Sequence, residues 1–528
     1  MGIAEANWEA ARRFAGLEAE SRKREDDAFS PEELCAGKTA SGEAALKVRG
    51  LSLHSPRDPC REARRAAEAA ASGAGPLLVL GFGLGYEAEA LAGALSAAGG
   101  ERPLIIIEKH REILRHAFAV RDLRGLLSYP KLILILGTGA KISSALGVFG
   151  DDTSGTPSGP PRIVKNRALV SLDRDFYAAV EAEAHTWASR QGVNQATARA
   201  FGGRWERNLK ANLPALRDLP GVCRLEGLLE GAAPVFLAAG GPSLDDAGPF
   251  LRDAWERCLV IAVDTSLRFL LARGIAPDFV VSVDPQYWNY RHLDRQDAPE
   301  TSLVAEPAVY PPCLRRPFAG VFLAGSSLPL GRRVEERVDR KGDLAAGGSV
   351  AATAWDFART LRPSSIWIAG LDLAFPGLKT HFKGAVFEDR ALAESARLCP
   401  AETWALRALL GGQPFRARDT DGGQVLSDRR LSLYAAWFAS RFERYPGLAN
   451  YRLRPPGSPP GLAVEGLSDA SPDALRALPR RREAIAALTA ARRAHIAATF
   501  FSPEAAAARG AAYEEALLDL PKMCMQRP

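Results

Sequence analysis

Short apolar runs that end at a glycine or an acidic residue recur along the chain, separated by helical patterns. Near the N-terminus, "PLLVLGFGLGYEAEALAGAL" (76–95) predicts a strand, a glycine turn and a helix. Two more strands are predicted at "PLIIIEKH" (103–110) and "KLILILG" (131–137). Because strands that alternate with helices form parallel sheets, this region predicts a Rossmann-like α/β unit.

A second series of apolar runs follows a helical stretch at 173–216 and predicts a second parallel sheet. Its strands are "VFLAA" (235–239), "LVIAVD" (259–264), "DFVVSVD" (278–284), "SLVAE" (302–306), "GVFLAG" (320–325) and "SIWIAGLD" (365–372). The predicted fold class is α/β, with two Rossmann-like parallel-sheet units linked by helices and a helical C-terminal segment. The predicted domains are an N-terminal Rossmann-like domain (1–165), a helical linker (166–230), a catalytic nucleotide-sugar-binding α/β domain (231–470) and the C-terminal helices (471–528).

The turn after the first strand of the second series, "FLAAGGPSLDD" (236–246), has the composition of an anion site. Gly240 and Gly241 allow the backbone to bend sharply and to approach a ligand. Ser243 with Asp246 three residues later predicts a helix N-cap of the capping-box type. A helix start presents free N–H groups and a positive dipole end, which favour phosphate. A tight turn without any ligand remains the alternative.

Acidic residues end several strands of the second series: Asp264, Asp284, Glu306 and Asp372. Ligands of doubly wound sheets bind at the carboxyl ends of the strands. Four acids at one edge, together with the glycine turn, therefore predict a site there. The earlier turn at Gly81, Gly83 and Gly85 resembles a nucleoside-binding turn, but a purely structural turn is the preferred interpretation.

Composition and charge narrow the class of protein. The chain has 528 residues, 47% of them hydrophobic, and 68 basic against 62 acidic residues leave a net charge of +6. This excess is too small to indicate a nucleic-acid partner. Seven scattered cysteines without a C-x-x-C pair indicate reduced thiols and no zinc pattern. No apolar run reaches the length of a membrane span, and we expect a cytoplasmic protein.

The order of four segments strongly resembles the Maf family of motility-associated factors, glycosyltransferases that modify flagellin. The segments are "LAAGGPSLDD" (237–246), "AVDTSLRFLLARGIAPDFVVSVDPQ" (262–286), "GGSVAATAWDFARTL" (347–361) and "IAGLDLAFPGLKTHFKG" (368–384). With flanking segments the resemblance covers roughly residues 40–470. The central part is also similar, more distantly, to bacterial CMP-sialic-acid sialyltransferases.

This resemblance implies roles for particular residues. Gly240, Gly241 and Ser243 would hold the nucleotide phosphate, and Asp264, Thr265 and Asp284 would lie near the ribose and base. Asp372 would lie at the sugar or phosphate edge, and His381 would be the catalytic base, with a pKa near 6–7 that nearby Lys379 and Lys383 would lower. Arg268 and Arg273 are further candidate cations. The family pattern is broken at Leu371 and in the segment 450–466.

The implied reaction moves a nonulosonic acid of the pseudaminic or legionaminic type from a CMP-activated donor to Ser or Thr of flagellin. It needs no obligatory cofactor or metal, since the departing phosphate carries only two charges. A second resemblance, to archaeal 6-hydroxymethylpterin diphosphokinases, implies an ATP- and Mg²⁺-dependent reaction with the aspartates as metal ligands. A third interpretation is a non-catalytic flagellin-binding protein with a vestigial nucleotide site.

Overall fold

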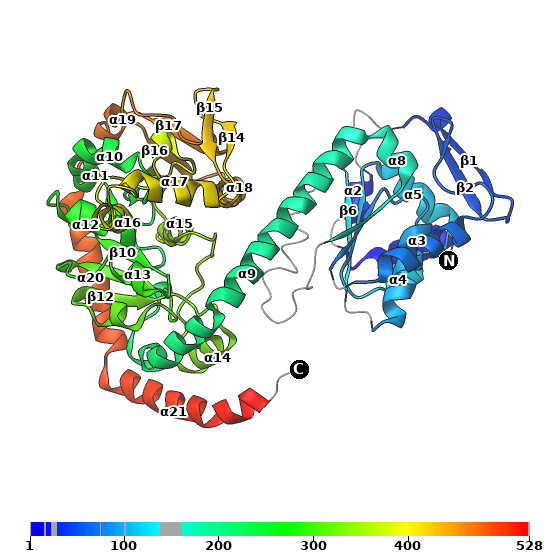
Figure 1. The fold of residues 1–528 in the computed structure, drawn as a ribbon. Coiled ribbons are helices and arrows are strands. Elements are labelled where there is room, and N and C mark those ends of the chain that lie inside the picture. The colour runs from blue at the N-terminus through cyan, green and yellow to red at the C-terminus, as the bar shows by residue number, and fades with distance from the viewer. Residues whose placement is uncertain are drawn as a thin grey trace. The chain divides into compact units, whose positions relative to one another are not determined.

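The computed structural model describes residues 2–14, 17–22, 29–73, 75–99, 102–137 and 161–525, with only the backbone described for 186–201 and 519–525. The chain divides into two compact units, Met1–Ala196 and Thr197–Pro528 (Figure 1). The division falls inside one long helix, α9 (Arg174–Asp218). The four domains predicted from the sequence remain a prediction.

The first unit is built on a four-stranded parallel sheet of order β6-β5-β4-β7. Its strands are β4 (Leu77–Leu80), β5 (Leu104–Glu108), β6 (Leu132–Leu136) and β7 (Arg162–Lys165). A small antiparallel sheet consists of β1 (Leu34–Lys38), β2 (Ala44–Val48) and β3 (Leu51–Ser52). The helices are α1 (Ile3–Ala11), α2 (Leu17–Ser21), α3 (Pro59–Ala71), α4 (Tyr86–Ala97), α5 (Arg111–Val120), α6 (Arg124–Leu127) and α8 (Arg167–Leu172). β4 and β5 are buried along their whole length because this sheet has no solvated face at its centre.

The second unit is built on an eight-stranded parallel sheet of order β12-β11-β10-β9-β8-β13-β16-β17. Its strands are β8 (Val235–Ala238), β9 (Leu259–Val263), β10 (Phe279–Ser282), β11 (Ala298–Ala305), β12 (Phe318–Leu323), β13 (Ser365–Ala369), β16 (Ala449–Leu453) and β17 (Leu467–Ala470). The predicted strands at 259–264, 278–284 and 365–372 thus lie parallel in one sheet, and the predicted fold class is confirmed.

Helices cover both faces of this sheet, which explains why its strands are apolar throughout. Along β8, Val235 and Leu237 face one core, whereas Phe236 and Ala238 face the other. The first core includes α15 (Val350–Thr360), α18 (Arg429–Arg444) and α20 (Arg482–Phe500); the second includes the end of α9, α11 (Leu251–Arg257) and α12 (Asp264–Leu271). The remaining elements are α10 (Leu244–Ala247), α13 (Tyr287–Tyr290), α14 (Pro329–Val338), α16 (Val386–Ala393), α17 (Ala401–Gly411), α19 (Pro472–Arg476), α21 (Pro503–Met525) and the hairpin of β14 (Phe415–Arg418) and β15 (Gln424–Ser427).

The strand order places a topological switch point between β8 and β13. From β8 the chain builds β9 to β12 on one side of the sheet, and then crosses to build β13, β16 and β17 on the other. The carboxyl ends of two strands at such a reversal flank the crevice where ligands of open α/β sheets bind. The glycine turn follows β8 and Asp372 follows β13, so both predicted features lie at this point.

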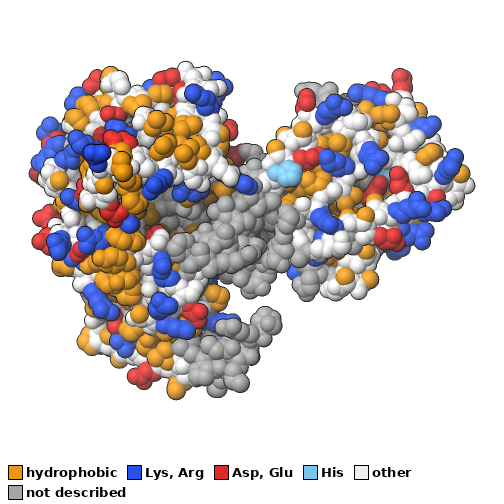
Figure 2. All heavy atoms as spheres, in the orientation of Figure 1, with side chains coloured by type: hydrophobic (Ala, Val, Ile, Leu, Met, Phe, Trp, Pro, Cys, Tyr) orange, Lys and Arg blue, Asp and Glu red, His pale blue; other side chains and the backbone are white. Residues whose placement is uncertain are grey.

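The face of the molecule shown in Figure 2 carries charges of both signs. On the face shown in Figure 2, Lys and Arg side chains are interspersed with acidic and apolar ones. Among the described residues, none of the helices has the length and apolar character needed to cross a bilayer.

Candidate functional site

The turn after β8 is held against the turn after β13 by close backbone contacts. The Gly241 N–H donates to the Gly370 carbonyl oxygen at 2.8 Å. A Cβ on Gly241 would lie 2.6 Å from that oxygen and 2.2 Å from Asp372 Oδ2. Glycine is therefore required at 241 by the protein itself, rather than by an approaching ligand as the sequence suggested.

Asp372 holds this turn in place. Its side chain is 2% exposed, and its Oδ2 accepts the backbone N–H of Ser243 at 3.1 Å. Burial raises the pKa of Asp372, and the hydrogen bonds from Ser243 and the charge of Arg452 oppose that rise. Arg452 is itself buried and paired with Asp469 at 2.7 Å. Asp372 is thus a buried carboxylate whose hydrogen bond fixes the shape of the turn.

The predicted capping box at Ser243 is wrong. Ser243 has helical backbone angles, its side chain makes no cap hydrogen bond with the described residues, and α10 is only four residues long. Asp372 takes the Ser243 N–H instead of a local side chain. A helix of one turn adds little dipole, so any anion site here depends on backbone N–H groups of the turn.

Gly240 is the residue of the turn that tolerates a side chain. A Cβ on Gly240 would make ordinary contacts only, 3.5 Å from Thr265 Cγ2 and 3.8 Å from His381 Cδ2. The hydrogen bonds of the described residues include none from the Gly240 N–H, whereas those of Gly241 and Ser243 are used. Gly240 therefore lies beside Thr265 and His381, and its N–H has no acceptor among the described residues.

The Asp264 side chain accepts hydrogen bonds from groups of the protein itself. It is fully buried, and its carboxylate accepts from Ser282 Oγ at 2.8 Å, from the Thr265 N–H at 2.7 Å and from Asn289 Nδ2. Burial raises its pKa, and these donors oppose that rise. Asp264 ties the ends of β9 and β10 to α13 and orients Thr265.

Asp284 lies at the end of β10 and is partly exposed. Its oxygens accept from the Gln286 N–H at 2.8 Å and from Gln286 Nε2 at 3.3 Å. Burial raises the pKa of Asp284. Glu306, the remaining strand-ending acid, is bound by the N–H groups of Ala308 and Ser327 and takes no part in this cluster.

His381 lies in the loop after β13, beside the glycine turn. Its Nδ1 is 3.1 Å from Thr380 Oγ1, and its ring centroid is 5.1 Å from that of Phe387. Burial, with smaller contributions from His292 and Arg430, lowers the pKa of His381 to about 4. The pKa is thus below 6–7, as the sequence leads us to expect, but the cause is burial and not Lys379 and Lys383.

The four predicted cations do not converge on this point. Lys379 and Lys383 are exposed, and the charged groups that lower the His381 pKa are His292 and Arg430. Arg268 pairs with Asp389 at 2.5 Å, and Arg273 stacks on the Phe269 ring at 3.5 Å.

Sequence reasoning missed two residues of this cluster, His292 and Phe387. His292 is 1% exposed and lies in the turn after α13, where the ring of Phe387 packs against it at 5.1 Å. Neither residue belongs to a motif or a periodic pattern, so only the packing of α13 and α16 brings them to the site.

The glycine turn of the first unit is filled by the protein's own side chains. Glu108 Oε2 accepts the N–H groups of Phe82 at 2.7 Å and Gly83 at 3.3 Å, and His54 Nε2 accepts that of Leu84 at 2.8 Å. A Cβ on Gly83 would lie 2.5 Å from His54 Nε2. These contacts support the structural interpretation of this turn.

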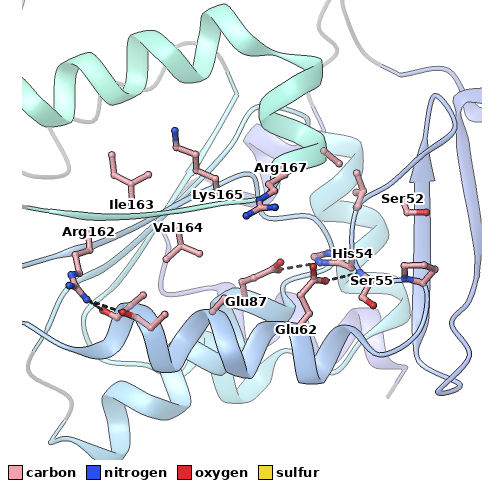
Figure 3. A pocket seen from close by; sticks show the side chains of 16 residues that line it. Ser52, His54, Ser55, Glu62, Glu87, Arg162, Ile163, Val164, Lys165 and Arg167 are labelled. Carbon is pink, nitrogen blue, oxygen red and sulfur yellow. Dashed lines mark hydrogen bonds and ion pairs between the residues drawn. The ribbon is translucent and has the colours of Figure 1, made fainter.

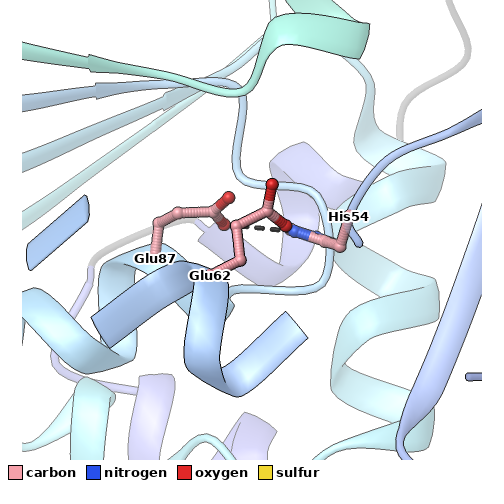
Figure 4. A group of neighbouring side chains, drawn as sticks. All are labelled: His54, Glu62 and Glu87. Atoms are coloured by element: carbon pink, nitrogen blue, oxygen red, sulfur yellow. Dashed lines mark ion pairs between the residues drawn. The ribbon is translucent and has the colours of Figure 1, made fainter. Parts of the chain in front are cut away.

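A groove of about 860 Å³ opens beside that turn, between α3 and β7 (Figure 3). His54, Glu62 and Glu87 lie along it with ligand atoms within 4.8 Å of one another (Figure 4). His54 Nε2 accepts the Leu84 N–H, so this nitrogen carries a lone pair and no proton. In neutral His54 the proton is therefore on Nδ1, which lies 3.2 Å from Glu87 Oε2. A metal ion at Nδ1 would have to displace that proton and leave an imidazolate, so the cluster does not fit a divalent cation.

Parts of the chain are similar to known proteins. Residues 207–377 match the family model described as 6-hydroxymethylpterin diphosphokinase MptE-like. Two uncharacterized proteins of Treponema pallidum (strain Nichols) are 37% identical over 213 residues and 32% identical over 95 residues. These matches cover 35% and 17% of this chain, and 54% and 41% of the relatives, so the chain spans about half the length of the curated relatives it matches.

A solved structure, that of the MAf glycosyltransferase from Magnetospirillum magneticum AMB-1, is similar with a TM-score of 0.54 and 17% identity. The match covers 93% of this chain and 78% of that chain. The MptE-like segment contains the turn after β8 and Asp372, and ends before His381. The chain therefore shares the fold of a Maf glycosyltransferase over nearly its whole length, and contains an MptE-like segment around the switch point.

Proposed function

We propose that this chain is a glycosyltransferase that binds a nucleotide-activated sugar at the ends of β8 and β13 and transfers the sugar to a protein hydroxyl. The observation that carries the proposal is the convergence, at a topological switch point, of a neutral histidine and a glycine turn whose Gly240 N–H has no acceptor among the described residues. The fold shared with a Maf glycosyltransferase supports it. By the same likeness we propose a CMP-activated nonulosonic acid as donor, Ser or Thr of flagellin as acceptor, and a cytoplasmic location.

In this proposal, His381 takes the proton of the acceptor hydroxyl as that oxygen attacks the anomeric carbon and the bond to CMP breaks. With a pKa of about 4 the imidazole is unprotonated at neutral pH and ready to accept. The departing phosphate approaches the Gly240 N–H, because the N–H groups of Gly241 and Ser243 already have acceptors. Asp372 acts indirectly, by holding the turn.

The diphosphokinase alternative requires carboxylates that converge on Mg²⁺. Asp264 and Asp372 are buried and bonded to protein donors instead. Within the described ranges, the group whose ligand atoms cluster for a metal belongs to the first unit and includes neither aspartate. The arrangement of the second unit therefore favours the glycosyltransferase.

Three measurements test the proposal. CMP, and not ATP with Mg²⁺, should raise the thermal unfolding midpoint of the full chain. Incubation with flagellin and a CMP-nonulosonic acid should increase the intact mass of flagellin by one or more sugar residues. The His381→Ala variant should bind CMP and transfer sugar about 10²- to 10⁴-fold more slowly. Stabilisation by ATP with Mg²⁺ alone would favour the diphosphokinase, and flagellin binding without any nucleotide response would favour the non-catalytic interpretation.

A further inference from the structure

We infer that His292 contacts the ligand in the candidate site and binds a hydroxyl or amide group of the transferred sugar once the Phe387 side chain has moved aside. This inference rests on the proposed function and adds a residue that neither the sequence motifs nor the comparisons assign.

The first observation is that the His292 side chain is buried without hydrogen bonds. It is 1% exposed, and neither Nδ1 nor Nε2 has a partner among the described residues. Other buried histidines differ: His54 accepts a backbone N–H, and His110 binds Asp173 at 2.6 Å. Burying polar atoms without partners destabilises a folded protein, and such groups in native structures often have a functional reason.

The second observation is the position of His292 at the carboxyl edge of the sheet. Asn289, three residues earlier, donates its side-chain N–H to Asp264, and its carbonyl accepts the His292 backbone N–H at 3.1 Å. This anchors the turn that carries the imidazole at the ends of β9 and β10. The charge of Asp284 raises the pKa of His292, and His292 lowers that of His381. The imidazole lies close to the proposed base, because both rings contact the same Phe387 side chain.

The third observation is that one exposed aromatic ring covers both histidines. The Phe387 ring centroid is 5.1 Å from that of His292 and 5.1 Å from that of His381, and Phe387 is 43% exposed. Helix α16, which carries Phe387, is held by packing on α17, by the surface pair of Arg268 and Asp389 and by Arg390 stacked on Trp288 at 4.2 Å. The helix can stay in place while the partly exposed Phe387 ring rotates away from the two histidines.

The chemistry of the position selects a neutral hydrogen-bonding group. Burial lowers the pKa of His292 to about 4, so at neutral pH the ring offers one N–H donor and one lone pair. The Asp284 carboxylate beside it would repel a phosphate or a carboxylate. A hydroxyl or amide group can both give and accept a hydrogen bond with the ring. Because His292 lies next to His381, that group belongs to the sugar near the reacting carbon rather than to the nucleobase.

The test compares His292→Leu and His292→Gln in the full chain, with His495→Leu as control because His495 is exposed on α20. Without ligand, His292→Leu should unfold at the wild-type temperature or above it, since it removes two unpartnered buried polar atoms. Calorimetric titration with CMP-N-acetylneuraminic acid, a donor of the same chemical class, should show affinity about tenfold lower in His292→Leu, the loss expected for one neutral hydrogen bond. Affinity for CMP should be unchanged, and His292→Gln should retain part of the sugar affinity.

The outcomes separate this inference from the proposed function. A wild-type protein that binds neither CMP nor the CMP-sugar refutes the proposed function. Wild-type binding of the CMP-sugar with unchanged affinity in His292→Leu and His292→Gln refutes only the role of His292. A lower unfolding temperature in both variants, with equal losses of affinity for CMP and the CMP-sugar, makes His292 a structural residue and also overturns the inference.

Discussion

Alanine at position 241 should disrupt the candidate site through the protein's own packing, whereas alanine at position 240 should not. A Cβ on Gly241 would lie 2.2 Å from Asp372 Oδ2, and ordinary contact begins at 3.4 Å, so the carboxylate has to move by about 1.2 Å, the difference of the two distances. That movement breaks the hydrogen bond to the Ser243 N–H. The second clash, with the Gly370 carbonyl, involves backbone that cannot rotate away.

The size of the effect follows from these two losses. Overpacking a tight site costs about 1–3 kcal/mol, and leaving a buried hydrogen-bonding group without its partner costs about 1–3 kcal/mol. Together the free energy of unfolding of the second unit should fall by about 2–6 kcal/mol. With an unfolding entropy of about 2.1 cal/mol/K per residue, this lowers the unfolding midpoint of a unit as large as Thr197–Pro528 by about 3–9 °C.

Scanning calorimetry of the full chain measures this shift, and Gly240→Ala is the matched control. Its Cβ would meet nothing closer than 3.5 Å, so its midpoint should stay within about 2 °C of the wild type. Since that Cβ points between Thr265 and His381, CMP binding should nevertheless weaken. An unfolding midpoint of Gly241→Ala within about 2 °C of the wild type would show that β8 and β13 are not packed as described.

The remaining predictions concern the titratable groups. Burial lowers the pKa values of His292 and His381 from 6.5 to about 4, so between these pH values the unfolded chain binds more protons than the folded chain. Urea titrations should therefore show that the free energy of unfolding falls as pH decreases from about 6.5 toward 4. If His381 is the base, turnover should not fall between pH 7 and 6, where an unperturbed histidine would become protonated. A fall in turnover in that range would contradict a base that is neutral there. Asp264→Ala should lower the unfolding midpoint by more than about 5 °C, because it leaves several buried donors without an acceptor. Asp284 is partly exposed, so Asp284→Ala should lower the free energy of unfolding by less than about 1 kcal/mol. Glu108→Gln should speed hydrogen exchange of the two turn amides it accepts, and unchanged exchange would mean that the turn needs no such acceptor.

Much of the second unit could be predicted from local sequence because the signals are local. A continuous apolar run followed by an acid specifies a buried strand and its end, and alternation with helices makes the strands parallel. The carboxyl ends of parallel strands share an edge, so Asp264, Asp284 and Asp372 were expected together with the glycine turn at that edge. The structure has them there, at the ends of β9, β10 and β13.

Which hydrogen bond each polar atom makes depends on partners far away in the sequence, so only the tertiary structure decides it. Ser243 gives its N–H to Asp372, 129 residues later, so the local capping box never forms. The Asp264 carboxylate accepts hydrogen bonds from Ser282 and Asn289. A sequence pattern that suggests a ribose-binding aspartate cannot reveal these partners. His292 stands in no motif, and reaches the site only because α13 and α16 pack there. Apolar periodicity fixes where elements begin and end, whereas burial and hydrogen-bond geometry, which arise when the elements pack, determine which side chains are left for a ligand.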